Sequence, residues 1–403
     1  MRSAPSMQAS RRSQVPGFEV MRIVGRIEQL RAAGRDVVSL TAGEPGSGAP
    51  PAVNDAAARV HADQTVLNYS PALGIRPLRE AIAAHYGDWY DLEVPAERVA
   101  VTTGSSGAFV LSFLAAFDHG ARVALARPGY PAYRNILTSL GIDVVDLDCG
   151  PEVRFQPTVE QLAAAHAERP LDGLILASPA NPTGTMLDRE QLTALSAWCA
   201  ESRVQMISDE IYHGISYTQP SVSALQVSGE AAAVSSFSKY WGMPGWRLGW
   251  AILPEHLVDA VDRLAGNVTL SAPHGSQIAA VEAFSRDSMQ FCQDQTAGYA
   301  RARRMVLEAL PQLGWGELAP ADGAFYVYAH LGQHLGDGPG RFRSSPAYAE
   351  ALLEEAGVAV VPGTDFDRLA GHEWIRLSLA PGPEKVAAGL ERILAFHGDR
   401  PSG

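Results

Sequence analysis

Residues 235–250 of the chain read SSFSKYWGMPGWRLGW and follow a short apolar run, residues 231–234, with the character of a strand. The stretch places Lys239 among hydroxyls, glycines and indoles, which suits a lysine in a tight, partly desolvated pocket. An ammonium group in a medium of low dielectric loses its proton more readily, and the neutral amine can form a Schiff base with an aldehyde. The hydroxyl of Ser236 and the guanidinium of Arg247 could hold a phosphate beside that aldehyde. An ordinary surface lysine on a loop is the alternative, because short motifs also occur by chance.

The spacing of Ser236 and Lys239 also matches the Ser-x-x-Lys motif of penicillin-recognising acyl enzymes. Those enzymes carry Ser-Asp-Asn and Lys-Thr-Gly elements as well, and neither tripeptide occurs in the sequence. The sequence therefore gives this second alternative no further support.

The same stretch closely resembles the lysine signature of the class I/II aminotransferases. These are fold-type I enzymes that depend on pyridoxal 5′-phosphate (PLP), and aspartate aminotransferase is a member. The resemblance implies that Lys239 is the Schiff-base lysine and that Ser236 and Arg247 bind the cofactor phosphate, with Ser238 in the same cofactor-binding stretch. It also implies an α/β fold, in which helices cover a mostly parallel central sheet and a smaller α+β domain lies beside it.

Length and composition indicate a globular protein with more than one core. The chain has 403 residues, 46% of them hydrophobic and 19% charged, so two domains or one large α/β domain with an appendage are expected. The formal net charge of −12 makes nucleic acid and anionic membrane surfaces poor partners. No apolar run approaches the roughly 20 residues that cross a membrane.

Cysteine usage favours a reduced, cytoplasmic protein. Cys149, Cys199 and Cys292 are far apart and lack the spacing of a metal site or a disulfide framework. Arg11 and Arg12 form a pair that occurs in export signals, but no uninterrupted apolar stretch follows them.

The order of the expected elements predicts two domains. A helix over residues 18–33 ends at Gly34 and precedes a short strand over 37–40. A long helix beyond residue 285 leads into a second set of strands and helices. Its expected strands cover residues 324–328, 358–361 and 374–379, and it includes a mobile loop over 331–345. The predicted division is a flexible N-terminal arm (1–17), the N-terminal part of the small domain (18–48), the large PLP-binding domain (49–285) and the C-terminal part of the small domain (286–403).

Repeated strand and helix units in the middle of the chain predict a parallel sheet covered on both faces. After an expected strand over 98–102, the sequence Gly104-Ser105-Ser106-Gly107 opens an apolar helix over 108–117. Small residues at such a turn let backbone N–H groups approach an anion. By the resemblance, Gly104, Ser105 and Ser106 form the cup for the cofactor phosphate. The other expected strands cover residues 121–126, 171–177, 204–207, 231–234 and 248–253.

Two strand ends carry polar residues where ligands bind in open α/β sheets. Asn181 lies in Asn-Pro-Thr-Gly, and the resemblance gives it hydrogen bonds to the phenolic oxygen of the cofactor and to the substrate carboxylate. Asp209 would keep the pyridine nitrogen protonated and so strengthen the ring as an electron sink. Tyr212 matches the tyrosine that hydrogen-bonds the same phenolic oxygen. Asp209 and Glu210 could instead bind Mg²⁺, but no phosphate-loop lysine motif precedes them, and no metal is predicted.

Four other positions enter through the resemblance. Gly43, in Gly-Glu-Pro, lies beside the substrate, and Tyr130 places its ring over the pyridine. Tyr69 reaches the cofactor phosphate of the neighbouring subunit, so a homodimer with shared active sites is expected. Arg376 lies in an apolar strand, and a substrate carboxylate would match its guanidinium, with a structural ion pair as the alternative.

Together these positions predict a PLP-dependent aminotransferase that moves an amino group between an L-amino acid and a 2-oxo acid. Lys239 would also carry the Cα proton of the substrate, and the kinetics would be ping-pong. The specificity stays open between aspartate-like, aromatic and broad, because Ser106 replaces a lysine that binds a distal carboxylate in some bacterial aspartate enzymes. Another fold-type I reaction, by a β-lyase, a cyclising synthase or an oxidative deaminase, is the alternative. A related transcription regulator is disfavoured, because its DNA-binding domain would not fit before Phe18.

Overall fold

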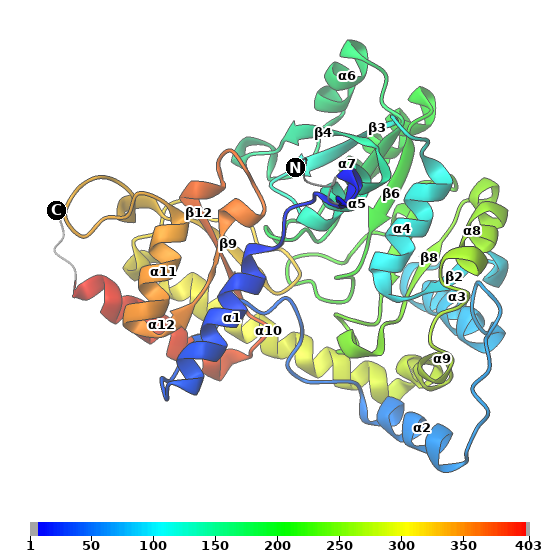
Figure 1. Ribbon diagram of the computed structural model, residues 1–403, viewed down its shortest axis with the longest axis horizontal. Helices are drawn as coiled ribbons and strands as arrows, with labels where there is room; N and C mark the ends of the chain where they lie inside the picture. The colour runs from blue at the N-terminus through cyan, green and yellow to red at the C-terminus, as the bar shows by residue number, and fades with distance from the viewer. Residues whose placement is uncertain (1–6, 400–403) are drawn as a thin grey trace, which may run out of the picture.

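The structure is a computed structural model that describes residues 7–399 (Figure 1). A seven-stranded sheet forms the centre of its larger part. From edge to edge the strand order is β2-β8-β7-β6-β5-β3-β4. The strands are β2 (Val99–Thr102), β3 (Arg122–Arg127), β4 (Asp143–Asp148), β5 (Gly173–Ala177), β6 (Gln205–Asp209), β7 (Ala232–Ser236) and β8 (Gly249–Ile252). Residues 1–6, the first part of the predicted arm, lie outside the described residues.

The sheet is mostly parallel, as predicted. Every neighbouring pair from β7 to β4 is parallel, whereas β8 runs antiparallel to β7 and to β2. Parallel strands joined through helices are buried on both faces, which is why β5 and β7 consist almost entirely of apolar and small residues. The carboxyl ends of the parallel strands meet at one edge, and the loops that follow them converge there.

Helices cover both faces of this sheet (Figure 1). On one face pack α4 (Gly104–Ala116), α5 (Pro131–Leu140) and α8 (Glu255–Val268). On the other face, α6 (Val159–Glu168) and α7 (Arg189–Ser202) cover the middle strands, and α3 (Arg76–Tyr90) and α9 (His274–Ala280) cover β2 and β8. The start of α7 follows from its sequence, because Asp188 and Gln191 form the reciprocal hydrogen bonds of a capping box.

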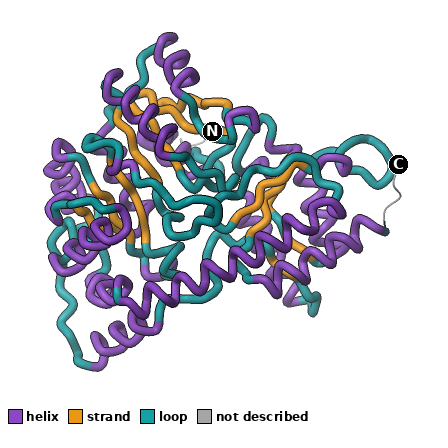
Figure 2. Tube along the Cα trace, turned by 180° about the vertical axis from the view of Figure 1, so that it is seen from behind, coloured by secondary structure: helices purple, strands orange, loops and turns teal. Residues whose placement is uncertain are grey.

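A smaller group of strands and helices lies beside the large sheet. The strands β11 (Val361–Pro362), β12 (Trp374–Ser378) and β9 (Tyr326–His330) form an antiparallel sheet, and β1 (Val38–Ser39) pairs with β10 (Val358–Ala359). Around them lie α1 (Glu19–Ala32), α11 (Ser345–Ala356) and α12 (Pro383–Gly398). The 28-residue helix α10 (Arg286–Leu313) runs from the larger part to α12, and Figure 2 shows its course from behind.

Some predicted elements differ from the observed ones. The strand expected over 358–361 is two strands, because β10 pairs with β1 and β11 pairs with β12. The helix expected from residue 108 begins at Gly104, and α2 (Pro51–Ala62) occupies a region for which no helix was expected. The loop over 331–345 contains a 3-10 turn, η7 (Gly332–His334), and its mobility stays a prediction. Within residues 7–399, no helix has both the length and the apolar character needed to cross a membrane.

Candidate active site

A cavity of about 500 Å³ opens at the edge where the parallel strands end. Loops after β2, β3, β5, β6 and β7 reach it, together with residues from α1 and β12. Most of the residues predicted from the sequence line it: Gly43, Ser105, Ser106, Tyr130, Asn181, Asp209, Tyr212, Ser238, Lys239, Arg247 and Arg376. Segments from both ends of the chain therefore form a single site.

Three predicted residues lie outside this lining. Gly104 lies beneath Arg247: it has φ +69°, and a Cβ there would be 2.6 Å from Nη2 of that arginine. Ser236 is fully buried, and its Oγ lies 2.9 Å from the carbonyl oxygen of Leu248 and 2.7 Å from Oγ of Ser238. Tyr69 is 81% exposed on the outside of the molecule. Ser238, rather than Ser236, is thus the hydroxyl that faces the cavity.

Lys239 is held as an amine of lowered basicity. Its Nζ donates a hydrogen bond of 2.6 Å to the carbonyl oxygen of Gly43. Burial lowers the pKa of Lys239 to about 8; Arg376 and Arg247 contribute to the lowering, whereas Glu44 and Asp209 oppose it. A substantial fraction of the amine is therefore neutral near physiological pH, and the neutral form is the nucleophile.

Asp209 ends β6 as a carboxylate that is 4% exposed. It accepts hydrogen bonds from the hydroxyl of Tyr133 and, at 3.1 Å, from the backbone N–H of Ile211. Burial nevertheless raises the pKa of Asp209 to about 6. A nearby cation would offset that cost, and the protonated ring nitrogen of PLP is such a cation.

The start of α4 provides a site for an anion. Backbone N–H groups of a first helical turn have no partner within the helix and lie at its positive end. Ser105 and Ser106 in this turn line the cavity together with Ser238 and Arg247. Close approach of β8 requires glycine at position 249, since a Cβ there would lie 2.6 Å from the backbone nitrogen of Ser105. A phosphate group fits this set of donors.

Arg376 presents an unused donor in the same cavity. Its Nη1 donates to Oδ1 of Asn181 and its Nη2 to the carbonyl oxygen of Thr41, both at 2.9 Å. Its buried Nε has no hydrogen-bond acceptor among the described residues. The guanidinium also lies over the rings of Tyr326 and Phe366, at 4.4 and 4.8 Å from their centres. A carboxylate ligand would supply the missing acceptor.

Two tyrosines of the site were missed in the sequence. Tyr133, which donates to Asp209, lies one helical turn after Tyr130 on α5, and this spacing was the available signal. Tyr326, on β9, places its hydroxyl 2.8 Å from that of Tyr212 and its ring under Arg376. No local motif identifies Tyr326, because only the fold brings β9 to the cavity.

The residues present fit PLP. Lys239 matches its aldehyde, Asp209 its ring nitrogen, Tyr130 its flat ring, and the turn at Ser105 with Arg247 its phosphate. No comparable set of metal ligands is found within residues 7–399, which contain no cluster of three or more His, Cys, Asp or Glu side chains that could hold an ion.

Fold and donor set define an enzyme of the PLP-dependent fold type I. The sequence matches the family described as aminotransferase class I and II over residues 35–393, and the chain belongs to this family. It is therefore a PLP-dependent aminotransferase, which moves an amino group between an amino acid and a 2-oxo acid.

Relatives are similar to this chain over nearly its whole length. Valine–pyruvate aminotransferase of Mycobacterium tuberculosis is 47% identical over 386 residues, which are 95% of this chain and 96% of the relative. Aspartate/prephenate aminotransferase of Thermus thermophilus is 36% identical, over 91% of this chain and 92% of the relative. The crystal structure of an aminotransferase from Mycobacterium tuberculosis is similar with a TM-score of 0.93 at 44% identity, and the match covers 98% of this chain and 100% of that chain.

Proposed function

We propose that this aminotransferase acts on neutral amino acids with apolar side chains. The observation that carries the proposal is the charge of the cavity wall. Among the described residues that line it, the cations are Lys239, Arg247 and Arg376. The aldehyde and phosphate of PLP and the substrate α-carboxylate account for all three. A second carboxylate on the substrate would find no cation of its own, and an unpaired buried charge is costly.

Apolar side chains on the same wall support this specificity. Phe18, Val20 and Met21 reach the cavity from the start of α1, and Phe109 and Ile136 reach it from α4 and α5. Burial of hydrocarbon against such a surface contributes about 0.8 kcal/mol per CH₂ group. The Mycobacterium tuberculosis relative at 47% identity is named for valine and pyruvate. Valine with pyruvate is therefore the exchange pair that we propose first.

We infer the role of each polar residue from its contacts. Arg376 binds the substrate α-carboxylate, and Asn181, 2.9 Å from its Nη1, orients that arginine. Lys239, with its lowered pKa, would take the proton from the substrate Cα and deliver it to C4′ of the bound cofactor, and in the second half of the reaction it would carry a proton in the opposite direction. When bound, PLP withdraws electrons from that carbon and makes its hydrogen acidic. Asp209 stays anionic to hold the ring nitrogen in its protonated form.

We also propose a cytoplasmic homodimer with shared active sites. Tyr69 lies with Trp246 and His274 along a surface groove, directly beside the stretch that carries Arg247. An exposed tyrosine there could reach the phosphate in a second subunit.

All three cysteines are free and buried, which suits a reducing compartment. The predicted domain boundaries belong to the same proposal, and the large sheet, β2 to β8, falls within the range 49–285.

The specificity is tested with the purified holoenzyme and single amino acids in the absence of an acceptor. Valine should convert the absorbance band of the bound cofactor with a second-order rate constant about tenfold or more above that for aspartate. Ser106→Lys should narrow this difference by raising the value for aspartate, because the lysine supplies a cation. Faster conversion by aspartate than by valine in the unaltered enzyme would contradict the proposal.

A further inference from the structure

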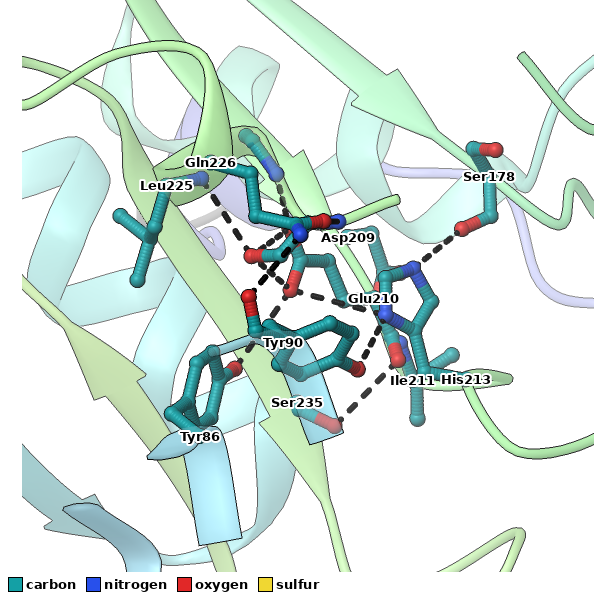
Figure 3. Close-up of polar contacts among 12 residues, drawn as sticks. Tyr86, Tyr90, Ser178, Asp209, Glu210, Ile211, His213, Leu225, Gln226 and Ser235 are labelled. Atoms are coloured by element: carbon teal, nitrogen blue, oxygen red, sulfur yellow. Dashed lines mark hydrogen bonds and ion pairs between the residues drawn. The ribbon is translucent and has the colours of Figure 1, made fainter. Parts of the chain in front are cut away.

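A buried polar network lies behind the active site, around Glu210 and His213 (Figure 3). Glu210 is 1% and His213 5% exposed, and neither lines the active-site cavity. The imidazole of His213 lies between the hydroxyl of Tyr90 and the carbonyl oxygen of Ser178, at 2.7 and 2.9 Å. The mechanism described above uses none of these side chains.

The contacts fix where the proton of His213 lies. A carbonyl oxygen only accepts, so Nε2 carries the hydrogen and donates it to Ser178. Burial lowers the pKa of His213 to about 4, which keeps the ring neutral and leaves a lone pair on Nδ1. Burial also holds the pKa of Tyr90 well above its usual value, so its hydroxyl stays protonated and donates to Nδ1. His213 is therefore held in a single orientation with a single tautomer.

Glu210 holds the elements that support this ring. Its carboxylate accepts from Oγ of Ser223 at 2.9 Å and from the backbone N–H of Ala224 at 2.7 Å. Ala224 begins the 3-10 turn η4 (Ala224–Gln226), and the side chain of Gln226 donates to the carbonyl oxygen of Tyr90 at 3.0 Å. One buried carboxylate thus connects the end of β6, through η4, to the end of α3 where Tyr90 lies.

Ser178 transmits this support toward the substrate site. Its N–H donates to the carbonyl oxygen of Asp209 at 3.3 Å, its Oγ accepts from the N–H of Leu187 at 2.9 Å, and its carbonyl oxygen accepts from His213. Ser178 directly follows β5 and begins the loop that carries Asn181 three residues later. The orientation of this one peptide group therefore sets the direction in which the loop leaves the sheet.

We propose that His213 is a positioning residue for the substrate carboxylate. By holding the carbonyl group of Ser178, it fixes the loop from which Asn181 reaches Arg376. The inference rests on the proposed roles of Asn181 and Arg376 in binding that carboxylate.

The test compares His213→Leu with His213→Gln. Leucine cannot donate to Ser178, whereas the amide nitrogen of glutamine lies near the position of Nε2 and can. In the leucine variant, KM should rise about tenfold for both the amino acid and the 2-oxo acid, with kcat lowered by about threefold or less, because a small displacement of the binding group weakens the complex. The glutamine variant should return both KM values to within about threefold of the unaltered enzyme.

Controls separate this role from loss of packing. His85 is a second buried imidazole, packed against the rings of Trp89, Trp241 and Phe284 in tilted and edge-on orientations. His85→Leu should lower stability without raising KM. Unchanged KM values in a folded His213→Leu enzyme, or no recovery with glutamine, would overturn the inference. If the leucine variant does not fold, His213→Asn replaces it, because its amide is too short to reach Ser178 and the same KM difference from glutamine is expected.

A parallel measurement on Arg376→Lys tests the carboxylate site separately from the role of His213. A large rise in its KM values supports the carboxylate site itself, independently of His213. If those KM values do not change, the proposed role of Arg376 is wrong and the inference about His213 falls with it. If they rise while His213→Leu behaves as the unaltered enzyme, only the inference about His213 is wrong.

Discussion

At the scale of single residues, Lys239 is the proposed Schiff-base lysine and should determine how cofactor uptake depends on pH. Burial lowers its pKa to about 8, and the neutral amine is the form that attacks the PLP aldehyde. In cofactor-free protein, the rate constant for PLP uptake, followed by absorbance, should rise with pH and level off above about 8. Lys239→Ala should show no absorbance band of a Schiff base with PLP and should have no turnover.

The sign of this pH dependence can be tested with a neighbour. Glu44 favours the protonated amine of Lys239. Glu44→Gln removes that negative charge and should move the midpoint of the pH profile for PLP uptake to lower pH. Asp337→Asn is the matched control, because Asp337 is an exposed carboxylate paired with Arg343 in a surface loop. A midpoint near 10.5, the ordinary value for lysine, would show that burial does not act on this amine.

The polar residues predicted from the sequence share one property. Asp209 ends a buried strand, and Asn181 and Lys239 follow such strands within a few residues, so strand pattern and motif together place them at the edge of the sheet. Tyr133 and Tyr326 lack that combination. The hydrogen bond from Tyr133 to Asp209 joins residues 76 positions apart, and that between Tyr212 and Tyr326 joins residues 114 apart. Such contacts depend on the tertiary fold. The spacing from Tyr130 places Tyr133 on the same side of α5 but does not identify Asp209 as its partner, and Tyr326 has no local signal.

At the scale of elements, α1 depends on a distant residue for its start. Phe18 is the N-cap residue, and no side chain in the helix itself caps it. Instead, the carboxylate of Asp365 accepts from the backbone N–H groups of Glu19 and Val20, at 3.1 and 3.4 Å. The ring of Phe18 then lies parallel to that of Tyr130, 6.2 Å between centres, at the cavity. This cap therefore fixes part of the proposed apolar wall.

Removal of the cap should change selectivity as well as stability. Asp365→Ala should cost about 1 kcal/mol, seen as a lower thermal midpoint, because two helical N–H groups lose their acceptor. Its kcat/KM should fall more for valine than for alanine, since the smaller side chain needs less of the wall. Asp365→Asn keeps an acceptor oxygen and should restore most of the loss. An equal fall for both amino acids would contradict a role in the wall.

Elements were predictable where one local signal dominates. Buried parallel strands read as continuous apolar runs, and β5, β6 and β7 were predicted to within two residues at each end. The edge strand β4, with sequence DVVDLD, carries three acids and gave no such signal. The division of residues 358–361 into β10 and β11 was not predictable either, because it depends on the partners: β10 pairs with β1, near the other end of the chain, whereas β11 pairs with β12, the next strand.

At the scale of the whole molecule, Tyr69 faces solvent in the single chain, within a group of exposed apolar side chains. Tyr69 is 81% exposed, and Val66, Leu67, Val268 and Leu270 near it are exposed by 73%, 44%, 52% and 53%. The segment around Tyr69 lies beside the one that follows α8, because Nδ1 of His274 is 2.7 Å from the carbonyl oxygen of Asn68. Exposed apolar residues grouped in this way are typical of a surface that binds another protein. A second copy of the chain is the partner that we propose, because it would also give Tyr69 a function.

Mixed dimers test this arrangement directly. Tyr69→Phe should weaken PLP binding about tenfold, because one hydrogen bond to a charged phosphate is lost, and Lys239→Ala should be inactive. Suppose Tyr69 serves the opposite subunit. A dimer of one Tyr69→Phe chain and one Lys239→Ala chain then contains one site with both native residues. The co-expressed, doubly tagged hybrid should therefore show about half of the native activity with native PLP affinity.

The alternative geometry predicts a different result for the same hybrid. If Tyr69 acts within its own chain, every site with a native lysine also carries phenylalanine at position 69. The hybrid would then bind PLP as weakly as Tyr69→Phe does, and excess PLP would be needed to restore activity. Dimers that carry both substitutions in one chain and none in the other are the control. They should bind PLP weakly if the site is shared, and with native affinity if Tyr69 acts within its own chain. A site shared between subunits therefore requires native PLP affinity in the first hybrid and its absence in the second.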